Sequence, residues 1–328
     1  MTIPVGIIGA GRRGTAHGNA AIDSGLGRVV SVCDIDLARA QALAERLAAK
    51  QGSPVQAYRS PEELLDAGSI VAVYITTPPP AHAAQTIAAL ERGLHVVLEK
   101  PIALTMEDAY AIDRARQRAG TIVHVCQQQR YAATTDVARR ILEGRKVGLA
   151  RVHLYRQRPD IRGNWDRRWG GGHIVEWAIH PIDLCRYLIG EVTSVYAAYS
   201  ENLPADSPDW DNWDSYAVTL RFANGAVGSI ATTYALFPGI EFSYTLDIVA
   251  EGGLLRWSRG LQWITPQGIE TFQNGPDPTT TVSRVVLEAI QTGDTSKIRI
   301  SYDDAMRTLA VVLGANRSAV TGEVVHLD

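Results

Sequence analysis

The sequence Gly-Ala-Gly-Arg-Arg-Gly at residues 9–14 lies between a short apolar run, Val5–Ile8, and a helical pattern, and it restricts the fold more than any other feature. In a strand-to-helix turn, the first glycine permits a tight backbone turn and the second lets the backbone approach a bound group. The third lets the helix pack closely on the strand. The motif therefore predicts a parallel sheet whose first strand turns directly into a helix.

Short apolar runs continue through the first 125 residues, with amphipathic segments between them. Near-continuous apolar character is typical of parallel strands that helices cover on both faces. Six such runs predict an α/β doubly wound parallel sheet, a Rossmann domain. The six runs are Val5–Ile8, Val29–Cys33, Val55–Tyr58, Ile70–Ile75, His95–Leu98 and Thr121–Cys126.

The turn and an acidic residue after the second run together predict a dinucleotide site. Asp34 follows Gly14 by 20 residues, at the end of the second strand. A pyrophosphate can then meet the N–H groups of the helix N-terminus, and the carboxylate can accept hydrogen bonds from a ribose diol. Because Asp34 repels a 2′-phosphate, we expect NAD. Arg12, Arg13 and Arg39 leave NADP open, since an arginine can pair with a phosphate.

The pattern changes after residue 125, where segments alternate apolar and polar residues. They predict an α+β domain with an open, mostly antiparallel sheet that helices cover on one face. Asn224-Gly225 predicts a hairpin. We expect domains at 1–125 and 126–328, helices near 134–144 and 302–321, and a candidate lid at 202–212. The alternating segments are 149–157, 192–200, 214–222, 226–234, 242–250 and 253–258.

Composition excludes several classes of protein. The 328 residues include 32 Lys plus Arg and 35 Asp plus Glu, so the chain has no bulk attraction for nucleic acid or an anionic membrane. No apolar run is long enough for a transmembrane helix, and the N-terminus lacks the charged region of a secretory signal. An odd count of three scattered cysteines fits free thiols. We expect a cytoplasmic protein.

The fifth strand ends in Glu99-Lys100-Pro101, and here the sequence resembles the Gfo/Idh/MocA family of sugar and cyclitol oxidoreductases. The resemblance extends to Arg130-Tyr131, three glycines at 170–172 and His180-Pro181-Ile182-Asp183. It implies an NAD(P)-dependent enzyme that transfers a hydride between the nicotinamide and a secondary alcohol of a sugar, polyol or cyclitol.

Lys100 and His180 are the strongest catalytic candidates. Desolvating an ammonium is expensive, so a lysine at a strand end in a ligand crevice favours a functional role, such as a hydrogen bond to a substrate hydroxyl. On a helix, Glu176, His180 and Asp183 share one face, which suits a general base with an orienting acid. In the family, an Asp and a His four residues apart complete the site. Glu176 stands in place of that Asp, one methylene longer.

The remaining candidates are assigned by their place in the sequence. A stiff Thr-Thr-Pro loop follows the fourth strand, and His82 lies at a helix start just beyond it. On the cofactor side we expect Gly9, Gly11, Arg12, Arg13, Gly14, Asp34, Thr76, Thr77, Pro78, His82, Glu99 and Lys100. On the substrate side we expect Arg130, Tyr131, Tyr155, Trp165, Trp169, His173 and Trp177. His173, Glu176, His180 and Asp183 could converge on a metal ion, but the family chemistry needs none and we expect none.

Two other functions stay open at this point. One is a glycoside-processing enzyme of the same family that retains and recycles NAD. The other is a dinucleotide-sensing regulator without catalysis, against which the Lys100 and His180 pair argues. We also expect a homodimer or homotetramer through the C-terminal sheet, with Tyr216 and Tyr234 adding aromatic interface area.

Overall fold

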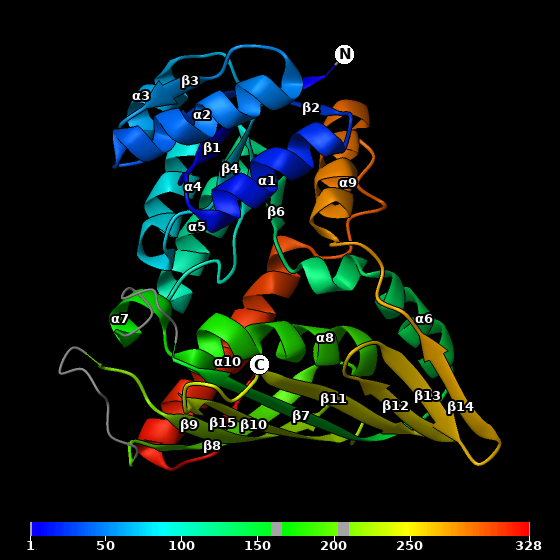
Figure 1. The fold of residues 1–328 in the computed structure, drawn as a ribbon. Coiled ribbons are helices and arrows are strands. Elements are labelled where there is room, and N and C mark those ends of the chain that lie inside the picture. The colour runs from blue at the N-terminus through cyan, green and yellow to red at the C-terminus, as the bar shows by residue number, and fades with distance from the viewer. Residues whose placement is uncertain (1, 159–165, 203–209, 328) are drawn as a thin grey trace. The chain divides into compact units, whose positions relative to one another are not determined.

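The protein, described here as a computed structural model for residues 2–158, 166–202 and 210–327, divides into two compact units (Figure 1). Unit 1 comprises Met1–Tyr131 and Asp277–Met306, and unit 2 comprises Ala132–Pro276 and Arg307–Asp328. Helix α9 (Thr279–Thr292) packs with unit 1 because Val282, Val286 and Leu287 join its apolar core. The predicted domain boundary at residue 125 does not account for residues 277–306, which return to unit 1. The assignment of cofactor and substrate domains stays a prediction.

Unit 1 is built on a six-stranded parallel sheet in the order β3-β2-β1-β4-β5-β6, which confirms the doubly wound fold. In this order the chain reverses direction between β1 and β4, and ligands of such sheets bind at the carboxyl ends of the strands beside that point. The strands are β1 (Ile3–Ile8), β2 (Gly27–Cys33), β3 (Gln56–Tyr58), β4 (Ala72–Ile75), β5 (His95–Leu98) and β6 (Val123–Val125). The helices between them are α1 (Arg12–Asp23), α2 (Leu37–Gln51), α3 (Pro61–Asp66), α4 (His82–Glu91) and α5 (Met106–Ala119).

Unit 2 contains a nine-stranded mixed sheet in the order β14-β13-β12-β11-β7-β10-β9-β8-β15. All neighbouring strands are antiparallel except β7 and β10, a parallel pair that the sequence did not predict. The strands are β7 (Val147–Gln157), β8 (Val192–Ser200), β9 (Ser215–Phe222), β10 (Val227–Leu236), β11 (Ser243–Ala250), β12 (Gly253–Trp257), β13 (Leu261–Thr265), β14 (Gly268–Phe272) and β15 (Val325–His326). The helices are α6 (Ala133–Leu142), α7 (Arg167–Gly170), α8 (Ile179–Ile189) and most of α10 (Tyr302–Thr321).

The alternation along β9 is confirmed, since Val218, Leu220 and Phe222 are at most 2% exposed. The same face carries Tyr216 and Tyr234, which are 3% and 0% exposed. The prediction that these tyrosines add interface area is therefore wrong. They face the core on the side that α8 and α10 cover (Figure 1), as the hydrogen bond from the Tyr216 hydroxyl to Asn316 of α10 shows.

Some sequence predictions fall wholly or partly outside this description. Trp165 and residues 203–209 of the candidate lid lie beyond the described residues. Within the part of the chain that the structure describes, no helix has both the length and the apolar character needed to span a bilayer.

A prediction for stability follows from the packing of α1. A Cβ on Gly14 would lie 1.9 Å from the Gly9 carbonyl oxygen, whereas a Cβ on Gly11 would meet no atom within 4 Å. We expect Gly14→Ala to reduce the free energy of unfolding by about 1–3 kcal/mol, the usual cost of overpacking. Gly11→Ala should unfold close to the wild-type temperature. Equal melting temperatures for the two variants in calorimetry would contradict this account.

Candidate active site

The chain leaves β1 at Gly9, whose φ of 100° lies in the left-handed region, and α1 begins directly after Gly11. Gly11 has no side chain to accept hydrogen bonds from the first N–H groups of α1, and the first helical turn holds no acidic residue. Open space lies on the Cβ side of Gly11. An uncapped helix N-terminus beside open space suits an anionic group, so this turn fits a dinucleotide pyrophosphate.

Asp34 lies directly after β2, beside this turn. Its Oδ2 accepts a hydrogen bond from the Ala10 main-chain N–H at 2.8 Å, and its Oδ1 accepts one from Asp36 at 3.0 Å. Each carboxylate oxygen has a second lone pair, so the group can still accept hydrogen bonds from ribose hydroxyls. Arg39 forms an ion pair with Asp36 at 3.1 Å, and the neighbouring Ile35 is 88% exposed and apolar.

The Thr-Thr-Pro loop after β4 supports the glycine turn. Thr76 donates a hydrogen bond from Oγ1 to the Gly9 carbonyl oxygen at 2.8 Å. His82 begins α4, as the sequence predicts, and is fully buried. Its Nδ1 lies 2.7 Å from the Pro101 carbonyl oxygen, and its Nε2 lies 2.8 Å from that of Thr77. Burial lowers the pKa of His82, and the neutral imidazole has a single N–H, which it can donate to one of these two carbonyl oxygens.

Glu99, at the carboxyl end of β5, is held by α1. Its Oε1 accepts hydrogen bonds from Arg13 Nε at 2.5 Å and His17 Nε2 at 2.7 Å, while its Oε2 accepts one from the Lys100 main-chain N–H at 3.2 Å. Burial acts to raise the pKa of Glu99, but the hydrogen bond and charge of His17, with the charges of Arg13 and Lys100, outweigh it and hold that pKa well below its usual range. Arg13 and Glu99, both predicted on the cofactor side, are therefore bound to each other.

His17, Glu99 and Cys126 lie close enough to hold a metal ion. The same carboxylate oxygen already forms an ion pair with Arg13, and burial raises the pKa of the Cys126 thiol well above its usual range. A neutral thiol is a poor ligand. The cluster is therefore best described as a buried ion-pair network.

Arg130 and Tyr131 do not project into open space. Arg130 is 2% exposed and forms an ion pair with Asp304. The Tyr131 hydroxyl, on a side chain 4% exposed, accepts a hydrogen bond from the Arg299 main-chain N–H at 2.9 Å and lies 3.0 Å from His124 Nε2. These contacts attach the returning segment to unit 1. They favour a structural role over the substrate contact that the sequence predicts.

In unit 2, the predicted catalytic segment forms a π-helical turn, Ile174–Ala178, followed by α8. Pro181 lies inside the helical run that continues without a break from His173 to Ile189, so it removes one main-chain N–H just after the π-helical turn. His180 is half-buried. Its ring lies edge-on to Trp177 with 6.5 Å between ring centroids.

The two acids near His180 have different partners. Glu176 accepts hydrogen bonds from the Tyr234 hydroxyl at 2.5 Å and from Trp177 Nε1 at 3.0 Å. Asp183 is fully buried and accepts a hydrogen bond from Thr308 Oγ1 of α10 at 2.9 Å. Glu176 is half-buried, so of the two carboxylates it is the more accessible.

The residues predicted to contact substrate do not all lie on one face of the unit 2 sheet, because successive side chains of a strand point to opposite faces. His173 is fully buried, lies 2.9 Å from Thr232 through Nδ1 and stacks on Tyr234 at 3.8 Å, and burial lowers its pKa well below the usual range. Trp177 lies beneath the Arg156 guanidinium at 3.5 Å. Tyr155 has the opposite strand parity to Arg156 and pairs with His153 on the other sheet face. Trp169 is 48% exposed.

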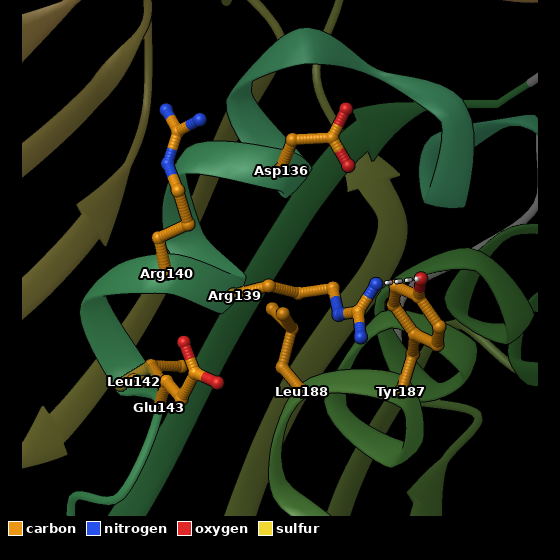
Figure 2. Close-up of a pocket in the computed structure, with 7 residues that line it drawn as sticks. All are labelled: Asp136, Arg139, Arg140, Leu142, Glu143, Tyr187 and Leu188. Atoms are coloured by element: carbon orange, nitrogen blue, oxygen red, sulfur yellow. Dashed lines mark hydrogen bonds between the residues drawn. The ribbon is translucent and has the colours of Figure 1, made fainter.

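A surface pocket of about 450 Å³ lies between α6 and α8 of unit 2 (Figure 2). Charged side chains of both signs line it, and Arg139 donates a hydrogen bond to the Tyr187 hydroxyl at 3.0 Å. None of the predicted site residues lines this pocket, so we do not assign the chemistry to it.

A doubly wound sheet with this glycine turn is the architecture of dinucleotide-binding domains. The chain belongs to the Gfo/Idh/MocA family. Residues 3–127 match the family described as "Oxidoreductase family, NAD-binding Rossmann fold", and residues 136–256 match the "GFO/IDH/MocA C-terminal domain". The resemblance that the motifs indicate is thus confirmed.

Characterised relatives are dehydrogenases and reductases of sugars and cyclitols. Myo-inositol 2-dehydrogenase of Thermotoga maritima is 27% identical over 69% of this chain and 67% of that protein. 1,5-Anhydro-D-fructose reductase of Ensifer adhaerens is 26% identical over 98% of each chain. A levoglucosan dehydrogenase solved in complex with NADH shares the fold, with a TM-score of 0.85 at 24% identity over all of both chains.

Two residues that bind predicted site residues were not themselves predicted at the site: His17, which binds Glu99, and Tyr234, which binds Glu176. His17 lies four residues after Arg13, one helical turn along, and this spacing could have indicated that both reach one partner. Tyr234 was predicted at an interface, but nothing in the sequence shows that β10 brings it to Glu176.

A pH dependence of stability follows from His124, which is fully buried. Burial, and secondly the charge of His17, lowers its pKa to about 3. The unfolded chain takes up a proton at this histidine below about pH 6.5, whereas the folded state does so only near pH 3, so stability falls as the pH falls between them. At pH 5 the loss is about 2 kcal/mol. In urea unfolding at pH 7 and pH 5, His124→Gln should reduce the wild-type loss by that amount. An unchanged loss would contradict this assignment.

Proposed function

We propose that the protein is an NAD-dependent dehydrogenase that transfers a hydride between a secondary alcohol of a sugar, polyol or cyclitol and the nicotinamide. The observation that carries the proposal is the uncapped N-terminus of α1 beside open space, with Asp34 at the end of β2 and Lys100 after β5. Parallel strands present their carboxyl ends at one edge, so these residues belong to one ligand-binding edge. The family and its named relatives support the substrate class.

In this proposal the glycine turn and Asp34 would hold the cofactor, which would supply the acceptor for the hydride of the carbinol carbon. Lys100 hydrogen-bonds the substrate oxygen and stabilises its developing negative charge. Neutral His180 accepts the hydroxyl proton as the carbonyl forms, which leaves the imidazole protonated. Glu176 is the acid proposed to orient His180. Asp183, the other predicted acid, is fully buried and hydrogen-bonded to Thr308, so any effect that it has on His180 would pass through α8, the helix that carries both residues.

We also propose that the protein is cytoplasmic and forms a homodimer or homotetramer through the open face of the unit 2 sheet. Tyr196 and Val249 are 43% and 45% exposed on that face. Exposed apolar and aromatic side chains on a sheet face favour burial against a second copy. A sedimentation mass near 35.6 kDa, that of one chain, would contradict this assembly.

Incubation with a panel of sugars and inositols tests the function. We expect NADH to form, measured at 340 nm, with at least one cyclic polyol, and NADP to be reduced more slowly because Asp34 repels its 2′-phosphate. Preincubation and dialysis control for cofactor carried through purification. Tightly retained NAD with no net turnover would instead support a glycoside-processing enzyme. A strong preference for NADP would overturn the cofactor assignment.

Substitution of the two proposed catalytic residues tests the mechanism. General-base catalysis contributes about 10²–10⁴-fold, so His180→Asn should reduce kcat by that factor, and Lys100→Ala should reduce it at least as much. The Kd for NADH, measured by fluorescence, should stay near wild type in the His180 variant. If either variant kept more than about a tenth of the wild-type kcat, less than 1.4 kcal/mol of transition-state stabilisation would be missing, too little for the assigned role.

A further inference from the structure

We propose that Glu99 is a positioning residue that fixes the Lys100 turn to the first helix, with Arg13 and His17 as its anchors. The functional part of this inference rests on the proposed role of Lys100, whereas the structural part stands on the contacts alone. All four residues belong to unit 1.

The two oxygens of the Glu99 carboxylate bind two different parts of the chain. Oε1 accepts hydrogen bonds from Arg13 and His17 of α1, at 2.5 and 2.7 Å. Oε2 accepts the hydrogen bond from the Lys100 main-chain N–H at 3.2 Å. The Glu99 main chain is itself fixed, since its N–H donates to the Ile75 carbonyl oxygen of β4 at 3.0 Å. The carboxylate therefore forms a bridge from α1 to the backbone of Lys100.

A purely structural strand end would not need this bridge. Glu99 is 5% exposed and His17 is 1% exposed, and a buried charge is costly unless it is paired and hydrogen-bonded. Apolar residues of similar volume often replace such buried pairs without loss of stability. A charged group kept beside Lys100 therefore indicates a task that an apolar side chain could not perform.

The bridge connects the glycine turn, where we propose that the cofactor binds, to Lys100, the proposed catalytic lysine. Helix α1 begins at the glycine turn that fits the pyrophosphate, and it holds Glu99 through Arg13 in its first turn and His17 one turn further along. The position of the lysine backbone is thereby set by the same helix as the cofactor phosphates. A displacement of about 1 Å in a reacting geometry can cost about 10²-fold in rate, so loss of the bridge should reduce kcat rather than cofactor affinity.

Glu99 also sets the electrostatic surroundings of the lysine, because the charges of Lys100 and Glu99 interact. The other titratable groups around this carboxylate are Arg13 and His17 of α1, the Cys126 thiol after β6, and His82 of α4, whose pKa is lowered chiefly by burial, raised by the Glu99 charge and lowered by the Lys100 charge; Asp277 acts on Arg13. Glu99 is the negatively charged residue that directly precedes Lys100 in the chain. Removing it should favour the neutral amine.

Competitive acylation of lysines with acetic anhydride measures this effect without any substrate. The chain has only four lysines, so Lys50, Lys146 and Lys297 serve as internal references in peptide mapping. We would compare wild type, Glu99→Gln and Glu99→Asp, with Asp113→Asn as the matched control. Asp113 is a half-buried carboxylate in unit 1 paired with Arg116 at 2.6 Å, so the control makes the same chemical change away from Lys100.

Glu99→Gln should lower the midpoint of the Lys100 labelling curve against pH by about half a unit or more, the direction expected when a neighbouring opposite charge is lost. Glu99→Asp keeps the charge but shortens the bridge by one methylene, so its labelling midpoint should move less. Both variants should lose about tenfold or more in kcat while the Kd for NADH stays within about threefold of wild type. Asp113→Asn should match wild type in all three measurements.

A lower melting temperature for Glu99→Gln, with an unchanged labelling midpoint and near-normal kcat, would show that Glu99 is only structural and would overturn the inference. If the single variant does not fold because Arg13 loses its partner, the Arg13→Gln/Glu99→Gln double variant removes both charges and is judged by the same criteria. Failure of the proposed function is distinguishable, because an inactive wild type would still show the shift in Lys100 labelling.

Discussion

The close approach of α1 to the end of β1 is the constraint on which unit 1 depends. No side chain fits at Gly14, so the helix lies against the turn and its N-terminus is fixed at the carboxyl edge of the sheet. Arg13 in the first turn of α1 and His17 one turn later are thereby placed to reach Glu99 beyond β4. One helix thus positions the glycine turn at its start and the lysine turn through its side chains.

In unit 2 the corresponding constraint is that successive side chains along each strand of the mixed sheet point to opposite faces. Alternate residues along β7 and β10 face the helices, and two of them, Arg156 and Tyr234, contact Trp177 and Glu176 of the π-helical turn. Glu176 is one methylene longer than the Asp that the family carries. Its carboxylate is held by Tyr234 and Trp177 rather than left to move, which restricts the longer side chain to one region.

Local patterns in the sequence predicted most elements but not all of their partners. The buried runs gave the parallel sheet, and Asn224-Gly225 forms the predicted turn, where Phe222 donates its main-chain N–H to Ala226 at 2.9 Å. Alternation alone shows which side chains share a face but not which strands pair. The parallel β7–β10 pair and the return of α9 to unit 1 therefore could not be predicted. Arg130 and Tyr131 were assigned to substrate by their place in the sequence, yet their partners, Arg299 and Asp304, are distant in sequence.

The buried ion pair near Lys100 links stability to chemistry. A carboxylate at the end of β5 loses hydration, and the donors of α1 offset that cost together with the Lys100 main-chain N–H and the Lys100 charge. Residues 13, 17 and 99 therefore depend on one another, since removal of either donor leaves a buried charge less well compensated. An apolar trio could fill the same volume, but it would offer no acceptor to the Lys100 N–H and no negative charge beside its ammonium. The network is thus better explained by the placement of the lysine than by the stability of the fold.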